Sequence, residues 1–523
     1  MKKTNNYSQA VREYSRQMSI IIKSMIAGLL AGLISSAYRF LLLKAEFASF
    51  SAYHFIRNHL QLIPFLFILL AGLGLLTMLL VKRYPLISGS GIPQVKGIIS
   101  GYITQNWLST LIEKFAGGIL AILAGLSLGR EGPSIQLGAS VAEGLADKFS
   151  ETKFEKKILI ASGAGAGLAA AFNAPLAGAL FALEEIYKYF SPIVCLSALA
   201  SAVVADYVSK LIFGTAPVFL FGQFADIPLK SYWILLLLGI LLGIFGFFYN
   251  KSILLSQKLY KKGQKLIGRY ILLLPFLLAG ILGLTFPFVC GGGHVLIDKI
   301  NFKSGLLFLL FALVLKFLFS VISFGSGAPG GIFFPFLVMG ALAGGITAKI
   351  SIQYLGLPEN VFYTLVTLSM CGFFSAIVRA PITGIILLAE MTGSVTTLLP
   401  LTVVSVISYM TADMLKSAPI YDSLLHSLIH NIGSEYMRMD VNSKVTFESI
   451  IHHGSPAADK KIKELGMPDN CLLIAVKREN QEFIPNGSTI LKEGDLLVLL
   501  TDVKEEATIR NSISDLTESS VLT

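Results

Sequence analysis

The stretch Leu128-Gly129-Arg130-Glu131-Gly132-Pro133-Ser134 decides the fold, because it places an Arg and a Glu between two strongly apolar segments. Residues 115–128 carry no charge, and the next acid downstream is Glu143. Pro favours the first turn of a helix, and the neighbouring glycines let the backbone approach a ligand closely. We therefore expect a helix from Pro133, with free N–H groups and a positive dipole end. The Glu131 carboxylate can fill this anion site when ionised and leave it when protonated.

Two interpretations of Glu131 compete. In a soluble protein it would be a helix-capping acid paired with Arg130. In a membrane, an ionisable residue marks a functional site by default, because its burial is expensive. The choice depends on whether the chain spans a membrane.

The composition indicates a membrane protein. The chain has 54% hydrophobic and 14% charged residues, whereas a soluble domain has ~25% charged residues. Residues 62–81 carry no charge, and ~20 apolar residues cross a hydrocarbon core. Similar runs occupy 232–249, 270–290 and 391–412, and none resembles a cleaved leader. The sequence predicts an all-α polytopic membrane protein with a small α+β cytoplasmic domain at its C-terminal end.

Charge is distributed unevenly along the chain. The net charge is +10, but residues 434–523 contain 10 Lys and Arg against 15 Asp and Glu. The basic excess lies in short segments between apolar runs, so the positive-inside rule places both termini in the cytoplasm. No basic stripe with interleaved aromatics points to nucleic acid. The four cysteines have no pairing or metal-ligand spacing, and we expect no metal site and no cofactor.

Composition shifts divide the chain into parts. We expect an amphipathic arm (1–18), a transmembrane domain (19–430) in two halves (about 19–212 and 231–430), a soluble module (434–510) and a disordered tail (511–523). The first spanning helix is expected over 19–47. Ser162 to Gly167 superficially resembles a dinucleotide-binding loop, but Leu168 replaces the third glycine. Gly163 and Gly167 are better explained as a small-residue packing face.

The two halves share interrupted elements. Each contains a Gly-Ser-Gly-x-Pro element, at residues 89–93 and 325–329. Each also has an Ala-Pro break followed, at the same spacing, by a Glu near a helix end, namely Glu184 and Glu390. Interrupted helices at corresponding positions indicate an internally repeated transporter with its site at mid-membrane. We expect three interrupted segments to converge there on a positive cavity that contains no fully buried cation.

Beyond residue 433 the chain changes character. Runs at 471–476 and 495–500 are typical of buried strands, separated by turns such as Asn486-Gly487. A short helix is expected over 459–465.

Three ordered motifs carry a family resemblance. Gly-Ser-Gly-Ile-Pro (89–93), Gly-Arg-Glu-Gly-Pro (129–133) and Gly-Ala-Pro-Gly-Gly-Ile-Phe (327–333) resemble the signatures of the CLC family of chloride channels and proton-coupled chloride transporters. The resemblance covers about residues 20–428. It implies a homodimer in the membrane lipid, with a separate pore in each subunit and an inverted repeat of broken helices.

The resemblance also implies roles for particular residues. Chloride would be bound by the hydroxyls of Ser90 and Tyr421 and by the backbone N–H groups of Ile332 and Phe333. Glu131 would be the external gate, and Glu185 the internal proton-transfer residue that channel members lack. Accessory contributions are expected from four neighbours: Gly89, Arg130, Gly132 and Lys114. Gln94 replaces a Glu common in relatives but leaves Ser90 intact, which favours chloride over fluoride.

The soluble module is similar to the C-terminal module of potassium-transport regulators (RCK_C, or TrkA-C). Such modules dimerise and some bind nucleotides, so a nucleotide regulator is a candidate ligand. Together with the absence of a recognisable targeting signal, the module favours a bacterial plasma membrane.

Three functions remain open. Glu131 with Glu185 favours proton-coupled chloride exchange. A passive chloride channel of the same fold would require Glu185 to be structural, and a potassium transporter would require a carbonyl-lined filter sequence that is missing. No catalytic Ser/His/Asp, metal or phosphate-loop arrangement indicates an enzyme.

Overall fold

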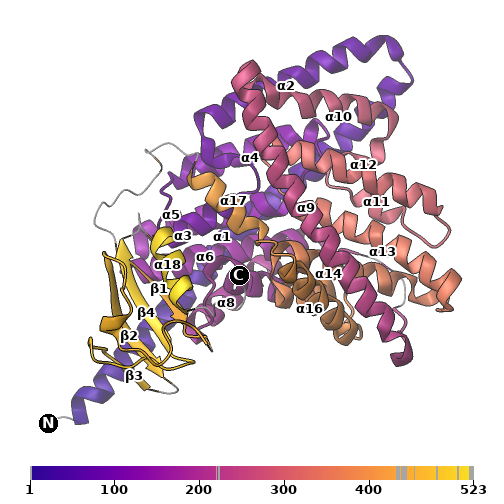
Figure 1. Ribbon diagram of the computed structural model, residues 1–523. Coiled ribbons are helices and arrows are strands. Elements are labelled where there is room, and N and C mark those ends of the chain that lie inside the picture. The colour runs from indigo at the N-terminus through magenta and orange to yellow at the C-terminus, as the bar shows by residue number, and fades with distance from the viewer. Residues whose placement is uncertain are drawn as a thin grey trace. The chain divides into compact units, whose positions relative to one another are not determined.

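The computed structural model describes residues 3–219, 221, 224–430, 436, 444–452, 454–478, 481–502 and 506–517. The chain divides into two compact units, Met1–Met437 and Arg438–Thr523. The first unit is helical, and the second is built on an antiparallel sheet (Figure 1).

The first half of the helical unit runs through α1 (Lys3–Arg57), η1 (Leu60–Leu62), α2 (Ile63–Arg83), η2 (Pro85–Ile87), α3 (Ile92–Ser100), α4 (Trp107–Leu123), α5 (Glu131–Phe149), α6 (Lys153–Phe172), α7 (Pro175–Phe181), the π-helical turn η3 (Ala182–Tyr187) and α8 (Pro192–Phe213). The second half runs through η4 (Leu229–Ser231), α9 (Tyr232–Ile267), η5 (Gly268–Leu272), α10 (Leu273–Thr285), η6 (Pro287–Val289), α11 (His294–Asp298), α12 (Leu306–Gly325), α13 (Phe333–Leu355), η7 (Glu359–Val361), α14 (Phe362–Val378), α15 (Pro381–Thr392), α16 (Leu398–Met414) and α17 (Ile420–Ile429).

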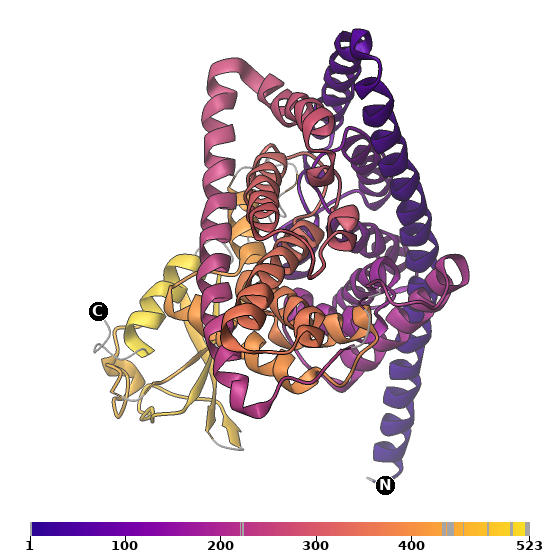
Figure 2. The same cartoon turned by 90° about the vertical axis from the view of Figure 1, so that its right-hand side faces the viewer.

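Several helices have the dimensions of membrane spans. Among the described residues, seven helical segments are long and apolar enough to cross a membrane. The long helices α1 and α9 run along opposite sides of the helical unit (Figure 2). The predicted helix at 19–47 lies within a longer helix, because α1 is continuous over Lys3–Arg57 and includes most of the predicted amphipathic arm. Residues 3–18 contain no Gly or Pro that would end the helix.

The two halves repeat each other element by element. The turn Pro85–Ile87 before Gly89 corresponds to Pro287–Val289 before Gly291, and both glycines have φ near +65°. The predicted match of residues 89–93 with 325–329 is therefore wrong, since the counterpart of Gly327 is Gly125, with nearly the same positive φ. The two Gly-Ser-Gly sequences are similar because each includes a glycine with a left-handed backbone conformation, although the two places are not equivalent in the repeat.

The predicted Ala-Pro breaks are real, and they join the halves. The Glu390 carboxylate accepts hydrogen bonds from the N–H groups of Leu176 (3.0 Å) and Ala177 (2.8 Å), at the start of α7. The Glu184 carboxylate in turn accepts from the N–H groups of Ile382 (3.2 Å) and Thr383 (2.7 Å), at the start of α15. Each half thus supplies the carboxylate that caps a broken helix of the other half.

Small residues allow α6 to pack closely against α5, the helix that starts within the Gly-Arg-Glu-Gly-Pro motif (129–133). A Cβ on Gly163 would lie 2.5 Å from the carbonyl oxygen of Gly138, and one on Gly167 would lie 2.2 Å from that of Ser134. The predicted small-residue face on α6 is confirmed, and it packs against α5.

The soluble unit contains β1 (Lys444–Ile450), η9 (Ile462–Glu464), β2 (Cys471–Arg478), β3 (Gln481–Phe483), β4 (Leu496–Asp502) and α18 (Glu506–Thr517). The strand order is β1-β4-β2-β3, with every neighbouring pair antiparallel. Both predicted strands are present. The predicted helix over 459–465 is wrong, because only the 3-10 turn η9 forms there, and Asp459 has a positive φ.

The predicted disordered tail is also wrong in part. Residues 511–517 belong to helix α18. Ile509 and Ile513 are buried in the core of the unit and Leu516 packs against it, so one face of the helix is apolar at helical spacing. The prediction for 518–523 lies outside the described residues.

An ion pair ties two strands of this unit together. Arg478 donates to both carboxylate oxygens of the buried Asp495, each at 2.7 Å. Burial by itself would raise the pKa of Asp495, but the hydrogen bonds from Arg478 and the Lys492 N–H lower it below its usual value. The carboxylate therefore stays ionised at neutral pH, and its contribution to stability is lost only as the pH falls through that lowered pKa.

The reciprocal caps give a stability prediction. Glu390→Ala leaves two N–H groups at the start of α7 without an acceptor, which should cost about 1–2 kcal/mol. We expect a lower melting temperature of the purified protein in detergent. Glu390→Gln, which keeps one acceptor oxygen, should lose less. The control is Glu359→Ala, because Glu359 is exposed. Equal melting temperatures for all variants would show that the cap contributes nothing.

Candidate functional site

Backbone hydrogen bonds bring the three motifs together. Gly129 and Gly331 exchange two N–H to O hydrogen bonds of 2.7 Å. Gly89 accepts from Gly330 (3.0 Å) and donates to Gly327 (3.3 Å). Segments far apart in the sequence thus form one junction, from which α5 and α13 start.

Glu131 lies at the centre of this junction. Helix α5 begins at Glu131 rather than at the predicted Pro133, which instead occupies the first turn, where its missing N–H costs nothing. The Glu131 side chain is fully buried, and neither carboxylate oxygen has a hydrogen-bond partner among the described residues. The nearest charge is Arg130, whose Nε lies 3.8 Å from Oε1. A Cβ on Gly129 would meet both Glu131 Oε2 and the Phe334 N, so the carboxylate lies beside the start of α13.

Two buried hydroxyl groups lie near Glu131. A Cβ on Gly132 would fall 2.4 Å from Ser90 Oγ, so only glycine permits this contact in the first turn of α5. Tyr421 lies at the start of α17, which packs against α3 (Figure 1). Its hydroxyl is buried with no partner among the described residues, and it interacts electrostatically with both Glu185 and Glu131. A buried hydroxyl without a partner is costly unless a ligand completes it.

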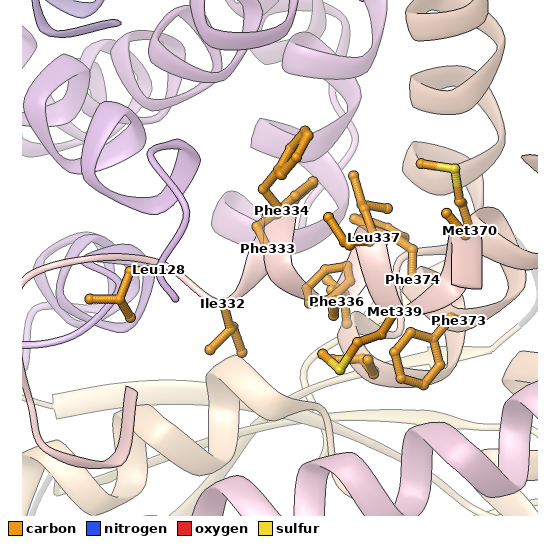
Figure 3. Close-up of a cluster of buried hydrophobic side chains, with 14 of the residues drawn as sticks. Leu128, Ile332, Phe333, Phe334, Phe336, Leu337, Met339, Met370, Phe373 and Phe374 are labelled. Atoms are coloured by element: carbon orange, nitrogen blue, oxygen red, sulfur yellow. The ribbon is translucent and has the colours of Figure 1, made fainter. Parts of the chain in front are cut away.

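The apolar wall of the site is aromatic. Helix α13 begins at Phe333, with Ile332 as its N-cap, and its first N–H groups have no acceptor within the helix. Figure 3 shows Phe333 and Phe334 within a cluster that includes Phe336 and Phe374. This packing excludes water around the helix start, which strengthens any interaction of its N–H groups with an anion.

Two buried lysines contradict the expectation of a cavity without a fully buried cation. Lys114 Nζ donates to the carbonyls of Ile87 (2.8 Å) and Gly89 (2.6 Å). Lys316 Nζ does the same in the second half, with Val289 and Gly291, both at 2.9 Å. In the described part of the chain neither ammonium has a carboxylate within ion-pair distance. Backbone carbonyls, and not carboxylates, are therefore the described partners of both lysines.

The sequence carries a signal for Lys316, although none of the three motifs includes it. It is the one charged residue within 306–325, and an isolated intramembrane charge indicates function by default. Lys114 was included only as an accessory residue, and the structure shows that it holds the Gly89 carbonyl.

Two cavities are lined by residues of the junction. One, of about 290 Å³, is lined by Ser88, Gly89 and Ser90 and by the basic side chains of Lys82, Lys261 and Arg269. Another, of about 20 Å³, touches Glu131 together with Glu46 and His294. The larger cavity offers a positively charged approach to Ser90.

Glu185 lies apart from Glu131, in the π-helical turn η3. It is buried, and its Oε1 lies 2.6 Å from Lys96 Nζ. Its neighbour Glu184 points to α15 and carries out the capping described above. The two adjacent acids therefore have different partners, and π-helical turns are often found at functional sites.

The broken helices, buried lysines and unpartnered carboxylate define a membrane protein built to hold small anions. Residues 73–413 match the family of voltage gated chloride channels, and residues 447–514 match the TrkA-C domain. The chain belongs to this chloride channel family, as the resemblance predicted.

Characterised relatives support the assignment. The chain is 36% identical over 441 residues to the H(+)/Cl(-) exchange transporter ClcA of Vibrio vulnificus, covering 81% of this chain and 93% of the relative. It is 33% identical to ClcA of Salmonella paratyphi B, with 82% and 92% covered. Among solved structures, a slow cyanobacterial Cl-/H+ antiporter aligns with a TM-score of 0.75 and 30% identity, covering 79% of this chain and 98% of that one. A eukaryotic CLC transporter shares the fold (TM-score 0.66, 21% identity, 80% and 74% covered).

The buried hydroxyls of Ser90 and Tyr421 give a binding prediction. Tyr421→Phe and Ser90→Ala each remove a donor from a desolvated ion, so chloride binding measured by calorimetry should weaken by about ten- to a hundredfold at most. Backbone N–H groups at Ile332 and Phe333 should reduce the loss. Ser423→Ala is the control, because that hydroxyl donates to Pro419 O on the same helix. Unchanged affinity in both variants would remove these side chains from the anion site.

Proposed function

We propose that the protein exchanges protons for chloride across the membrane. The observation that carries this proposal is the buried Glu131 carboxylate, which has no hydrogen-bond partner among the described residues and lies against the starts of α5 and α13. An ionised Glu131 occupies the place that suits an anion, and protonation releases it. Chloride and the gate thus compete for the same free N–H groups.

In this proposal Ser90, Tyr421 and the N–H groups of Ile332 and Phe333 bind chloride at the centre. Lys114 orients the Gly89 carbonyl and adds positive potential, as Lys316 does from the second half. Gly89 and Gly132 allow the close approach, and Arg130 attracts anions beside the gate. Phe333 and its aromatic neighbours exclude water from the site.

The channel alternative needs a structural Glu185, and the local geometry argues against this. The capping role at this helix end belongs to Glu184, so Glu185 is not needed for it. Glu185 is instead buried beside Lys96. This arrangement suits a proton route with Glu185 at its inner end and Glu131 at its outer end. The named relatives, which are exchange transporters, favour the same choice.

The remaining assignments follow the family. The protein would be a homodimer with one anion path in each subunit, embedded in the lipid of a bacterial plasma membrane with both termini in the cytoplasm. Chloride and protons are its transported ions, and we propose no cofactor for the helical unit.

Coupling is tested in liposomes by following chloride and pH together. An imposed chloride gradient should drive protons uphill in the wild type. Glu131→Gln, which mimics the protonated gate, should keep chloride flux and lose proton movement, and Glu185→Gln should also lose proton movement. Glu143→Gln is the matched control, a buried acid of α5 that pairs with Gln105 and Lys156. Chloride movement by the wild type without any pH change would favour the channel.

We further propose that the TrkA-C module regulates transport. It forms a compact unit with its own core, and it follows α17, the helix that carries Tyr421. A cytosolic ligand could shift transport only if it binds two states of the protein with different affinity, and a coupling of ~1–3 kcal/mol is typical. Nucleotides, including cyclic dinucleotides, are the first candidates because related modules bind them.

Truncation tests this regulation. A chain ending at Asn431 should still fold and transport, because the helical unit has its own core, but its basal rate should change or its response to nucleotides disappear. Melting temperatures of the full-length protein with a nucleotide panel should reveal the ligand. If the truncated and full-length proteins transport alike and no nucleotide shifts the melting temperature, the module only supports the assembly.

A further inference from the structure

Glu185 of η3 belongs to a cluster of four charged side chains. The other members are Lys96 of α3, Asp422 of α17 and Lys188, the residue that directly follows η3. Lys96 Nζ of α3 lies 2.6 Å from Glu185 Oε1 and 2.5 Å from Asp422 Oδ1 of α17. Lys188 Nζ lies 2.6 Å from the other Asp422 oxygen. One ammonium is therefore shared between two carboxylates.

The local backbone fixes this cluster. Helix α3 starts after Gly91, which has a φ of +96°, and Lys96 lies three residues beyond the Gly-Ser-Gly-Ile-Pro motif. The π-helical turn ends at Lys188, also in a left-handed conformation, with a φ of +55°. Asp422 directly follows Tyr421. The same segments that hold the anion-binding hydroxyls therefore also position the charges around Glu185.

The two carboxylates differ in their access to water. The Glu185 side chain is 3% exposed, whereas that of Asp422 is 35% exposed. Asp422 also lines an open cavity of about 630 Å³, together with Lys258, Lys261 and His426. The cluster thus joins a buried acid to a solvated one through a single ammonium.

This arrangement solves an energetic problem for a proton-carrying Glu185. If Glu185 were the only partner of Lys96, protonating it would leave a buried ammonium unpaired, which is strongly unfavourable. A second carboxylate keeps the ammonium paired in both states. Asp422 also keeps a partner of its own in either state, because Lys188 binds its second oxygen.

We propose that Lys96 is a counter-ion exchanged between Glu185 and Asp422, so that Asp422 holds the ammonium while Glu185 carries the proton. The inference rests on the proposed exchange function and extends it to two positioning residues. The proton comes from water in the cavity beside Asp422 and binds a Glu185 carboxylate oxygen. When it leaves toward Glu131, the Glu185 carboxylate pairs with Lys96 again.

Other ionisable groups near Glu185 are kept constant in the test. Tyr421 and Tyr187 lie close to it, and Lys188 faces Asp422. Helix α6 packs against the same turn and carries Lys156 and Lys157 just before Ile158, which contacts Leu183. These groups remain in every variant, so differences between variants report on Lys96 and Asp422.

The test measures proton uptake by the full chain in liposomes, as a function of the pH on the Glu185 side. Lys96→Met removes the charge that favours ionised Glu185, so the midpoint of proton uptake should move to higher pH. Asp422→Asn leaves the ammonium to Glu185 alone, so the midpoint should move to lower pH. An opposite charge at this range changes the proton affinity of a carboxyl by roughly tenfold or more, which corresponds to about one pH unit.

A double-mutant cycle separates partner exchange from simple charge proximity. If Asp422 acts through Lys96, Lys96→Met/Asp422→Asn should behave like Lys96→Met alone. Asp422→Glu should restore the wild-type midpoint. Asp206→Asn is the control, since it removes a carboxylate that is paired with Lys210 at 2.7 Å and lies outside this cluster.

Chloride flux is measured in every variant to show that the variant is folded. If Lys96→Met does not fold, the comparison of Asp422→Asn with Asp422→Glu still tests the proposal. Two outcomes would overturn the partner exchange while leaving coupled transport intact. In the first, Asp422→Asn shifts the midpoint of proton uptake equally in the wild type and in Lys96→Met, and in the second it does not shift the midpoint at all. A wild type that moves no protons would instead overturn the proposed function itself.

Discussion

Backbone N–H groups at the start of a broken helix must find an acceptor, and the rest of this structure depends on that requirement. Within a membrane no water is at hand to satisfy them, so each free N–H group away from a partner costs several kcal/mol. At α7 and α15 the acceptors are the carboxylates of Glu390 and Glu184, which are fixed parts of the protein. At the starts of α5 and α13 the nearby carboxylate is that of Glu131, which is not fixed in this way, because neither of its oxygens has a hydrogen-bond partner in the described part of the chain. A structural helix start and an anion site thus differ in whether the acceptor can leave.

The two buried lysines show how the repeat supports this site. Lys114 and Lys316 each bind two carbonyl groups that precede or include a left-handed glycine, in equivalent places of the two halves. Carbonyl partners satisfy the donors of an ammonium but do not neutralise its charge. A carboxylate partner would have done both, and the site would then have lost its attraction for an anion. Lys96 differs from both, because its ammonium pairs with two carboxylates.

Much of this could be predicted from the sequence, because the decisive features are local. The membrane class follows from uncharged runs, and the three motifs carry the family. Contacts between distant segments could not be predicted. Nothing local indicates that Glu184 and Glu390 cap each other's halves or that Lys96 reaches Asp422, since the partners are hundreds of residues apart. The prediction that residues 89–93 correspond to 325–329 is wrong for a related reason. The same residue types can provide the same backbone conformation at positions that are not equivalent in the two halves. The tail was misjudged for another reason, since the apolar face of α18 consists of only a few residues within a polar segment.

The reciprocal caps also constrain how the chain is made. The N–H groups of Leu176 and Ala177 are made before their acceptor, because Glu390 is synthesised more than two hundred residues later. Until then the first half is inserted with one helix start incomplete, and water, lipid headgroups or the insertion machinery must serve as a temporary acceptor. Final closure of the first half is thus coupled to arrival of the second, in the manner of a long-range contact that forms late. The halves repeat one arrangement, yet the first half is not a finished folding unit until the second has been made.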